Sequence, residues 1–331
     1  MQTMRSLEEI DIRELNGFLI GHASDAAAAT GCTVILSHAG ATAGVDVRGG
    51  GPASRELALL EPHNMIQAIH AVLLAGGSAY GLDAAAGVMA YLEEQDCGFD
   101  VGCGKVPIVC GAALFDLQVG ESSLRPNKEM GYAACLDAAS GLHAAENGNI
   151  GAGTGATVGK LAGPARSCKS GLGCYAVRYG ALQVAAVIAV NALGDIYDLQ
   201  SGRIIAGLRS VDGRTLANSG DAMLSVAGTT AASNPFTTNT TIGCILTNAK
   251  LSKPEAHKVA CVAHDGIARV IFPVHTQADG DTMFCLADGK SEAPVDLVAS
   301  IAAEVTSRAI MHAVRAAKPA YGLPAACSFP D

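Results

Sequence analysis

Two adjacent threonines, Thr240 and Thr241, stand directly before an apolar, β-rich segment deep inside a chain of 331 residues. A cut between Asn239 and Thr240 would make Thr240 a new N-terminus. Its hydroxyl and its free α-amine would then supply a nucleophile and a candidate base on one residue, which is a known variant of the serine triad. The alternative is a turn that leads into a buried strand, because Asn and Thr are common before strands.

Further polar residues lie where apolar segments begin or end. Asn191 closes the apolar run 184–190, and an amide at a strand end can donate a hydrogen bond to a developing oxyanion. Its alternative is a turn-forming Asn. Asp279 and Asp281 flank a glycine before a strand expected from Thr282, where they could orient a catalytic amine, bind a metal or form a turn. A metal site needs more ligands, and the nearby histidines lack compact zinc spacing, so we expect no metal.

A glycine-rich run at residues 148–160 has two nucleotide-binding interpretations. In the first, Gly151, Gly153 and Ala156 have the spacing of a dinucleotide fingerprint, which keeps a nucleotide-binding oxidoreductase as an alternative function. Residues 142–147 make a poor preceding strand, however, and no acidic residue is placed convincingly downstream.

The second interpretation, a phosphate-binding loop, fails on the residues themselves. Thr154 stands where glycine is required, and Leu161 stands where Ser or Thr is required. Two structural interpretations remain: a tight backbone crossing that needs small residues, or a close approach that delivers Lys160 into a site. We therefore expect no cofactor.

The composition excludes several classes of function. The net charge is −9 and Trp is absent, which argues against a nucleic-acid-binding surface. None of the eleven cysteines forms a Cys-x-x-Cys pair, which favours a reducing compartment. The N-terminus lacks a signal-peptide pattern, and the longest apolar run, 184–190, is too short to cross a bilayer. We expect a cytoplasmic protein with no nucleic-acid or membrane partner.

The pattern of apolar segments predicts one α/β unit without a domain boundary. We expect strands at residues 32–36, 106–114, 184–190, 242–246 and 283–286. Helices are expected at residues 64–74 and, capped by Ser78, up to about Gln95. Residues 207–234 are rich in Ser, Gly, Thr and Asn, so we expect an exposed loop ahead of the proposed cut.

The chain after the threonine pair has a regular β-α-β-α pattern. Ser252 and Glu255 form a capping box with Pro254 in the first turn, which predicts a helix to about Val270. A strand at residues 282–287 leads into a final helix. Apolar residues recur there at every fourth position: Leu297, Ile301, Val305 and Ala309.

Short motifs in a characteristic order cover nearly the whole chain. They occupy residues 30–36, 44–50, 74–82, 151–155, 239–242, 264–269 and 273–284. In this order the motifs resemble the DmpA-type self-processing peptidases, a family of N-terminal-nucleophile hydrolases. That family includes L-aminopeptidase/D-esterases, β-peptidyl aminopeptidases and a hydrolase of nylon (6-aminohexanoate) oligomers.

The resemblance implies a role for each candidate residue. Thr240 matches the family's nucleophile, which self-cleavage after Asn239 sets free. Asn191 matches an oxyanion-stabilising Asn. Asp279 and Asp281 match the pair of residues that supports the amine of the nucleophile.

The resemblance also places the chain within the family. Lys160 matches a Lys of the Asn-Thr-Thr branch to which the nylon-oligomer hydrolase belongs. Phe115 stands where that hydrolase has a pocket Tyr, which is a departure from the branch. Phe115 and Gly153 are accordingly expected to line the substrate pocket.

The fold that the resemblance implies is a four-layer α/β/β/α sandwich. Its chain is cleaved into residues 1–239 and 240–331, and the cleaved units assemble as a homotetramer. The activity implied is that of an aminopeptidase or amino-acid-oligomer amidase, which acts on a small peptide or oligomer. An inactive oligomeric scaffold of the same family is the remaining alternative.

Overall fold

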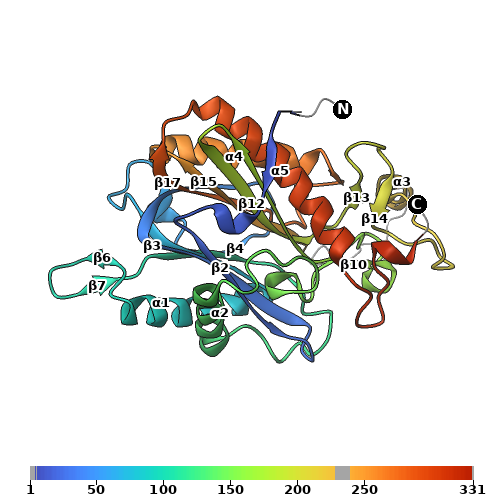
Figure 1. Cartoon of the computed structure of the whole chain (residues 1–331). Helices are drawn as coiled ribbons and strands as arrows, with labels where there is room; N and C mark the ends of the chain where they lie inside the picture. The colour runs from blue at the N-terminus through green and yellow to red at the C-terminus, as the bar shows by residue number, and fades with distance from the viewer. Residues whose placement is uncertain (1–3, 5, 228–238, 330–331) are drawn as a thin grey trace.

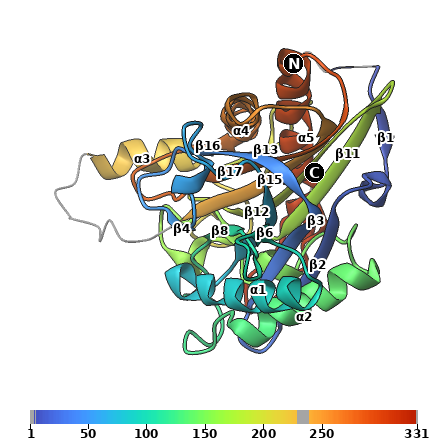
Figure 2. The same cartoon turned by 90° about the vertical axis from the view of Figure 1, so that its left-hand side faces the viewer.

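The fold is a sandwich of two β-sheets with helices on both outer faces, as the computed structural model in Figure 1 shows. The structure describes residues 4, 6–227 and 239–329. The helices over one sheet are α4 (Lys253–Ala268) and α5 (Val295–Ala316), and those over the other are α1 (Ala84–Glu94) and α2 (Lys128–Ser140). Figure 2 shows the two helical layers on opposite sides of the sheets.

The two sheets are joined by one long strand, β3 (Thr30–Val47), which belongs to both. The sheet under α4 and α5 has the order β1 (Glu8–Ile10), β11 (Leu172–Tyr179), β12 (Leu182–Asn191), β15 (Thr240–Ala249), β17 (Thr282–Ser291), β3. The other sheet has the order β2 (Leu19–Asp25), β3, β5 (Ile69–Ala75), β8 (Val109–Ala113), β4 (Ala53–Arg55).

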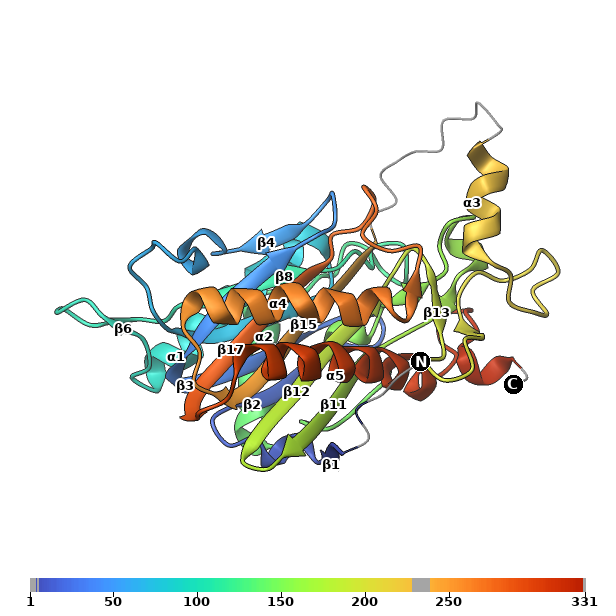
Figure 3. The same ribbon diagram turned by 90° about the horizontal axis from the view of Figure 1, so that it is seen from above.

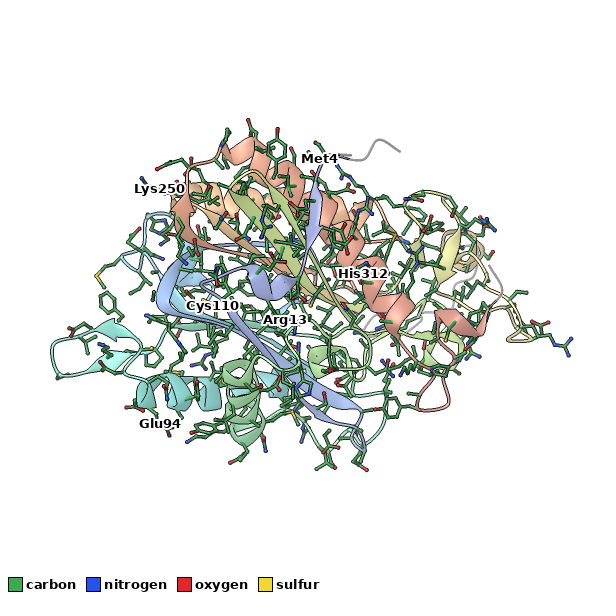
Figure 4. All side chains as sticks on the ribbon, in the orientation of Figure 1. Met4, Arg13, Glu94, Cys110, Lys250 and His312 are labelled. Atoms are coloured by element: carbon green, nitrogen blue, oxygen red, sulfur yellow. The ribbon has the colours of Figure 1, made fainter. Side chains whose placement is uncertain are left out.

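The core has three apolar layers, which follow from alternation along the strands. On β12, Ile188 faces α4 and α5, whereas its neighbour Val187 faces the other sheet. Cys110 of β8 lies in the layer between the sheets, whereas Glu94 and Lys250 are exposed on the surface (Figure 4). The four-layer α/β/β/α arrangement that the family resemblance implies is confirmed.

Glycines let the layers approach closely. A Cβ on Gly44 of β3 would lie 2.1 Å from the backbone nitrogen of His257 in α4. A Cβ on Gly173 of β11 would lie 1.9 Å from the carbonyl oxygen of Ala309 in α5. Since no side chain fits at either position, these two glycines let α4 and α5 pack directly against the strands of their sheet.

Most of the predicted elements are present. The expected strands at 32–36, 184–190, 242–246 and 283–286 fall within β3, β12, β15 and β17, whereas the one expected at 106–114 is shorter and forms β8 (Val109–Ala113). Helix α4 begins with the predicted capping box, in which the Ser252 amide donates to Glu255 Oε2 at 2.8 Å. Helix α5 buries Ile301, Val305 and Ala309 against its sheet.

The helix predicted at residues 64–74 is wrong. Most of this segment forms β5, which lies between β3 and β8 with every residue buried. A strand covered on both faces reads as a continuous apolar run, and periodicity alone does not separate such a run from a buried helix.

The predicted cap at Ser78 is also wrong, although the helix it was meant to begin is present. A 3-10 turn, Ser78–Asp83, precedes α1, and Gly77 takes the capping position without a side-chain hydrogen bond. Ser78 has a left-handed φ of 56°, which places its side chain away from the capping geometry.

The segment predicted as a loop, residues 207–234, contains a helix, α3 (Ser219–Ala227). Residues 228–234 of this segment lie outside the described residues. Figure 3 shows α3 at the periphery, beside β13 (Asp195–Tyr197). The buried Asp195 carboxylate anchors it, accepting hydrogen bonds from the Ser219 amide at 2.6 Å and the Ser219 hydroxyl at 2.7 Å. The Asp195 side chain, which is distant in sequence, therefore fixes the position of α3. The local composition of residues 207–234 does not indicate this contact.

One helix in the described part of the chain has the length and apolarity to cross a membrane. It is α5, and 78% of its most apolar window is buried inside the protein. Figure 3 shows it running beside α4 over the sheet. Burial of this kind is typical of a core helix.

Candidate active site

The ends of three strands meet around the Asn239–Thr240 bond. β12 is antiparallel to β15 and places Asn191 opposite Thr240. β17 is parallel to β15, and a bridge between Asn239 and Asp279 extends this pairing beyond the strands. Strand register therefore makes neighbours of residues that lie far apart in the sequence.

The Asn239–Thr240 peptide is buried and held on both sides. Only 3% of Thr240 is exposed, and its hydroxyl donates a short hydrogen bond to the Asn239 carbonyl oxygen. The Gly280 amide donates to the same carbonyl oxygen at 2.8 Å, and the Asn239 amide donates to the Ala278 carbonyl at 2.8 Å. The hydroxyl thus lies against the carbonyl it would attack, and that carbonyl already has a backbone donor.

The two aspartates bind backbone and side-chain donors of this region. Asp281 Oδ1 accepts from the Thr241 amide at 2.6 Å, and its Oδ2 lies 2.7 Å from His275 Nδ1. Asp279 Oδ2 accepts from the Thr276 amide at 2.9 Å and the Thr276 hydroxyl at 2.6 Å. No group of three or more possible metal ligands occurs among the described residues.

Lys160 and Asn191 are bound to each other inside the protein. Lys160 Nζ donates to the main-chain oxygen and to Oδ1 of Asn191, both at 2.8 Å. The Thr157 amide donates to the same Oδ1 at 3.0 Å, and Asn191 Nδ2 donates to the Phe115 carbonyl at 2.9 Å. Asn191 thus connects the glycine-rich segment, β12 and the end of β8.

Burial moves the pKa values of two groups in this site, Lys160 and Asp279, closer to neutral pH. Removal from water lowers the pKa of Lys160 to about 7, and the charges of Asp279, Asp116 and Asp281 partly oppose this shift. Burial, reinforced by the neighbouring Asp281 charge, raises the pKa of Asp279 to about 6. A lysine that gives up its proton near neutral pH has the property required of a general base.

The glycine-rich segment crosses other backbones and carries Lys160 into the site. A Cβ on Gly153 would lie 2.1 Å from the backbone nitrogen of Leu172, and one on Gly159 would lie 1.9 Å from that of Leu208. The structure describes all of this segment. It contains a 3-10 turn, Gly151–Gly153, and the short strand β9 (Thr157–Val158), but no α-helix. Because both nucleotide motifs need a helix there, the context for nucleotide binding is missing.

One of the two predicted pocket residues, Phe115, contacts this site directly. The Phe115 carbonyl binds Asn191, and the Phe115 side chain is partly buried. Gly153 is buried, and its carbonyl accepts from Lys169 Nζ at 3.1 Å. A cavity of about 640 Å³ lies elsewhere, between α3 and β16 (Ile271–Phe272). Contact of Phe115 and Gly153 with a substrate stays a prediction.

Sequence reasoning missed several buried polar residues. Lys169 is fully buried and donates to the carbonyl oxygens of Gly153, Ala156 and Ser170. Asp116 is buried beside the Gly77 amide, which donates to it at 2.7 Å. Asp116 could have been found by the signal that found Asn191, a polar residue just after an apolar strand.

Comparison with known proteins decides the family. The sequence profile of peptidase family S58 matches residues 11–326. The chain belongs to peptidase family S58. The DmpA-type resemblance of the sequence motifs is thereby confirmed.

Its S58 relatives include proteins named for amide hydrolysis. An uncharacterized aminopeptidase of Mycobacterium leprae is 39% identical, over 96% of this chain and 93% of that protein. A 6-aminohexanoate-oligomer endohydrolase of Kocuria sp. (strain KY2) is 32% identical, over 84% of this chain and 75% of that protein. This S58 member is accordingly a hydrolase that acts on amide bonds.

The S58 fold is also found in a solved structure. The L-aminopeptidase D-Ala-esterase/amidase of Ochrobactrum anthropi, described as a variant of the Ntn-hydrolase fold, superposes with a TM-score of 0.70. The superposition covers 98% of this chain and 91% of that one, at 16% sequence identity. At that identity the likeness concerns the fold, and it agrees with the sandwich described above.

Proposed function

We propose that this chain is a self-cleaving amide hydrolase whose nucleophile is Thr240. The observation that carries the proposal is the contact of the Thr240 hydroxyl with the carbonyl oxygen of Asn239, to which the Gly280 amide also donates. A nucleophile next to a carbonyl, with a donor placed on the carbonyl oxygen, is the arrangement that acyl transfer needs.

Self-cleavage begins with attack of Thr240 Oγ1 on the carbonyl carbon of Asn239. Lys160 in its neutral form accepts the hydroxyl proton, the carbonyl oxygen becomes negative, and the Gly280 amide stabilises that charge. The C–N bond then breaks as the Thr240 nitrogen takes this proton from the Lys160 ammonium, which leaves an ester between Asn239 and Thr240 Oγ1. Water hydrolyses the ester and frees both the Asn239 carboxylate and the Thr240 hydroxyl.

In the mature enzyme the same hydroxyl attacks the carbonyl of a substrate amide. The new α-amine of Thr240, or Lys160 in its neutral form, accepts the hydroxyl proton. A pKa near 7 leaves much of Lys160 uncharged at neutral pH. The charges of Asp279 and Asp281 favour the ammonium form of Lys160, and we propose that they orient the new α-amine of Thr240.

The role of Asn191 differs between the two stages. In the uncut chain its Nδ2 donates to the Phe115 carbonyl and its Oδ1 holds Lys160, so the Gly280 amide is the donor on the Asn239 carbonyl. We propose that Asn191 stabilises the oxyanion only with a substrate, through the second hydrogen of the same Nδ2.

The two products of cleavage remain one folded unit. The fragment 240–331 holds β15 and β17 at the centre of a sheet and α4 and α5 above it. Separation would expose both core layers on either side of these strands. We propose a homotetramer of such cleaved units, which native mass spectrometry tests.

Two relatives, named an aminopeptidase and a 6-aminohexanoate-oligomer endohydrolase, support a proposal for the substrate class. We propose a small peptide or amino-acid oligomer that enters with its amide carbonyl next to Thr240. Phe115 and Gly153 are the proposed lining residues of its pocket.

The decisive experiment is N-terminal sequencing and intact mass measurement of the purified protein. We expect two fragments, the smaller of which begins at Thr240, and a single intact chain for Thr240→Ala. A Thr240→Ala chain that still splits at this bond would refute the nucleophile. An acylating probe that labels cleaved wild-type protein but not Thr240→Ala separates an enzyme from an inactive scaffold.

A further inference from the structure

His275 has an unusual backbone conformation next to the acidic pair. Its φ is 54°, in the left-handed region that few residues other than glycine adopt, apart from Asn, Asp and His. Such conformations persist where surrounding contacts hold them, and they concentrate at functional sites. The contacts that hold His275 therefore indicate what it does.

Both donors of His275 converge on one carboxylate oxygen. Its Nδ1 lies 2.7 Å from Asp281 Oδ2, and its backbone amide donates to the same oxygen at 3.3 Å. The other oxygen of Asp281 accepts from the Thr241 amide at 2.6 Å. A continuous set of hydrogen bonds thus joins the His275 ring to the residue that follows the nucleophile.

The environment of the ring fixes which nitrogen carries the proton. Nδ1 faces a carboxylate, so it is the donor. The ring of His264 meets the His275 ring edge-on, with centroids 4.8 Å apart, and His264 Nε2 lies 3.0 Å from the Asp46 carbonyl oxygen. Within the described part of the chain, His275 Nε2 and His264 Nδ1 are buried and have no hydrogen-bond partner. The polar contacts of the His275 ring are therefore directed at Asp281.

We infer that His275 is a positioning residue for the reaction at Thr240. Its Nδ1–H holds Asp281 in the orientation that binds the Thr241 amide, and this bond fixes the Asn239–Thr240 peptide against Gly280. The inference rests on the proposed function, because the reaction it serves is self-cleavage at Thr240. It assigns a role to a residue that does not itself touch the reacting atoms.

The chain offers a matched pair of variants at this position. Asn tolerates the left-handed backbone, and its Nδ2 can replace the Nδ1 donor of the imidazole. Asp tolerates the same backbone and has the same shape, but at neutral pH it offers only acceptors to Asp281. His275→Asn thus keeps a donor for Asp281, whereas His275→Asp lacks it and adds a negative charge; His275→Gly, which lacks the donor and adds no charge, separates the two effects.

Self-cleavage of freshly translated chains is followed on a denaturing gel over time. We expect His275→Asn to cleave close to the wild-type rate. His275→Asp should cleave about 10- to 100-fold more slowly, as for the loss of one hydrogen bond to a charged group. Thermal unfolding of both variants with Thr240→Ala added compares the stability of intact chains.

Equal cleavage rates for the two variants would overturn the inference, as would a folded His275→Asn that is as slow as His275→Asp. If the Asp variant does not fold, His275→Gly takes its place, because glycine accepts the backbone and lacks the donor. A wild-type chain that folds and never cleaves would instead refute the proposed function itself.

Discussion

Lys160 Nζ lies 2.8 Å from both the main-chain oxygen and the side-chain oxygen of Asn191. Both acceptors are neutral, so the buried ammonium gains hydrogen bonds but no direct ion pair. Burial consequently outweighs the more distant carboxylates and lowers the pKa of Lys160 to about 7. Burial therefore leaves Lys160 able to serve as the proposed base, whereas its hydrogen bonds to Asn191 favour the ammonium form and connect the pH dependence of the proposed reaction to Asn191.

Replacing Lys160 tests whether its neutral form is needed. Arg remains charged at every accessible pH, and Met has no basic atom, so both Lys160→Arg and Lys160→Met should slow self-cleavage by about 100- to 10,000-fold. The wild-type rate should rise with pH through about 7 and level off above it. A Lys160→Arg chain that folds and cleaves at the wild-type rate would show that charge alone suffices.

The Gly280 amide can be tested through the space at its α-carbon. A Cβ on Gly280 would lie 2.8 Å from the Gly51 carbonyl oxygen and 3.0 Å from Thr240 Oγ1. Gly280→Ala should therefore displace the donor or the nucleophile and slow self-cleavage by about 100-fold, as for a lost oxyanion donor. Gly51→Ala is the control, because its Cβ would meet nothing closer than 3.9 Å. Similar cleavage rates for the two variants would contradict this account.

Much of the site could be predicted because its residues stand at strand ends. Asn191 and Thr240 flank apolar runs that any reading of the sequence finds, and strand register then makes them neighbours. Lys160 was harder, because its position depends on a glycine-rich crossing whose packing partners, such as Leu172, are distant in sequence. The glycine-rich motif predicts that two backbone segments approach closely, and the fold is needed to identify the second segment.

The features that could not be predicted depend on burial. From its sequence context Lys169 is expected to be a surface lysine between polar neighbours. In the structure it is fully buried and donates hydrogen bonds to three carbonyl oxygens. The β5 segment is compatible with a helix or a strand until β3 and β8 pair with its two edges and the core layers on either side of the sheet cover its two faces. His275 gives no local sign of its left-handed backbone. In each case tertiary contacts decide what the local pattern leaves open.

Asp279 should make stability depend on pH. Its folded-state pKa of about 6 lies above the value of about 3.9 expected in an unfolded chain, so the folded state binds this proton more tightly. The stabilisation that comes from this proton is complete below pH 4. It is lost as the pH rises through 6, which lowers the free energy of unfolding by up to about 3 kcal/mol. With Thr240→Ala as the parent, Asp279→Asn should remove this loss. Parallel curves of unfolding free energy against pH for parent and variant would contradict it.

Asn191→Asp should move the pH dependence of self-cleavage upward. The variant keeps an acceptor for Lys160 but places a negative charge 2.8 Å from Nζ, which favours the ammonium and should raise the midpoint by about 1–3 pH units. Asp279→Asn removes a charge that favours the same ammonium, so its midpoint should move downward. Rates of freshly translated chains, measured between pH 5 and about 10, give each midpoint separately from its plateau. Two shifts of opposite sign identify Lys160 as the titrating base, whereas shifts in the same direction would assign the midpoint to another group.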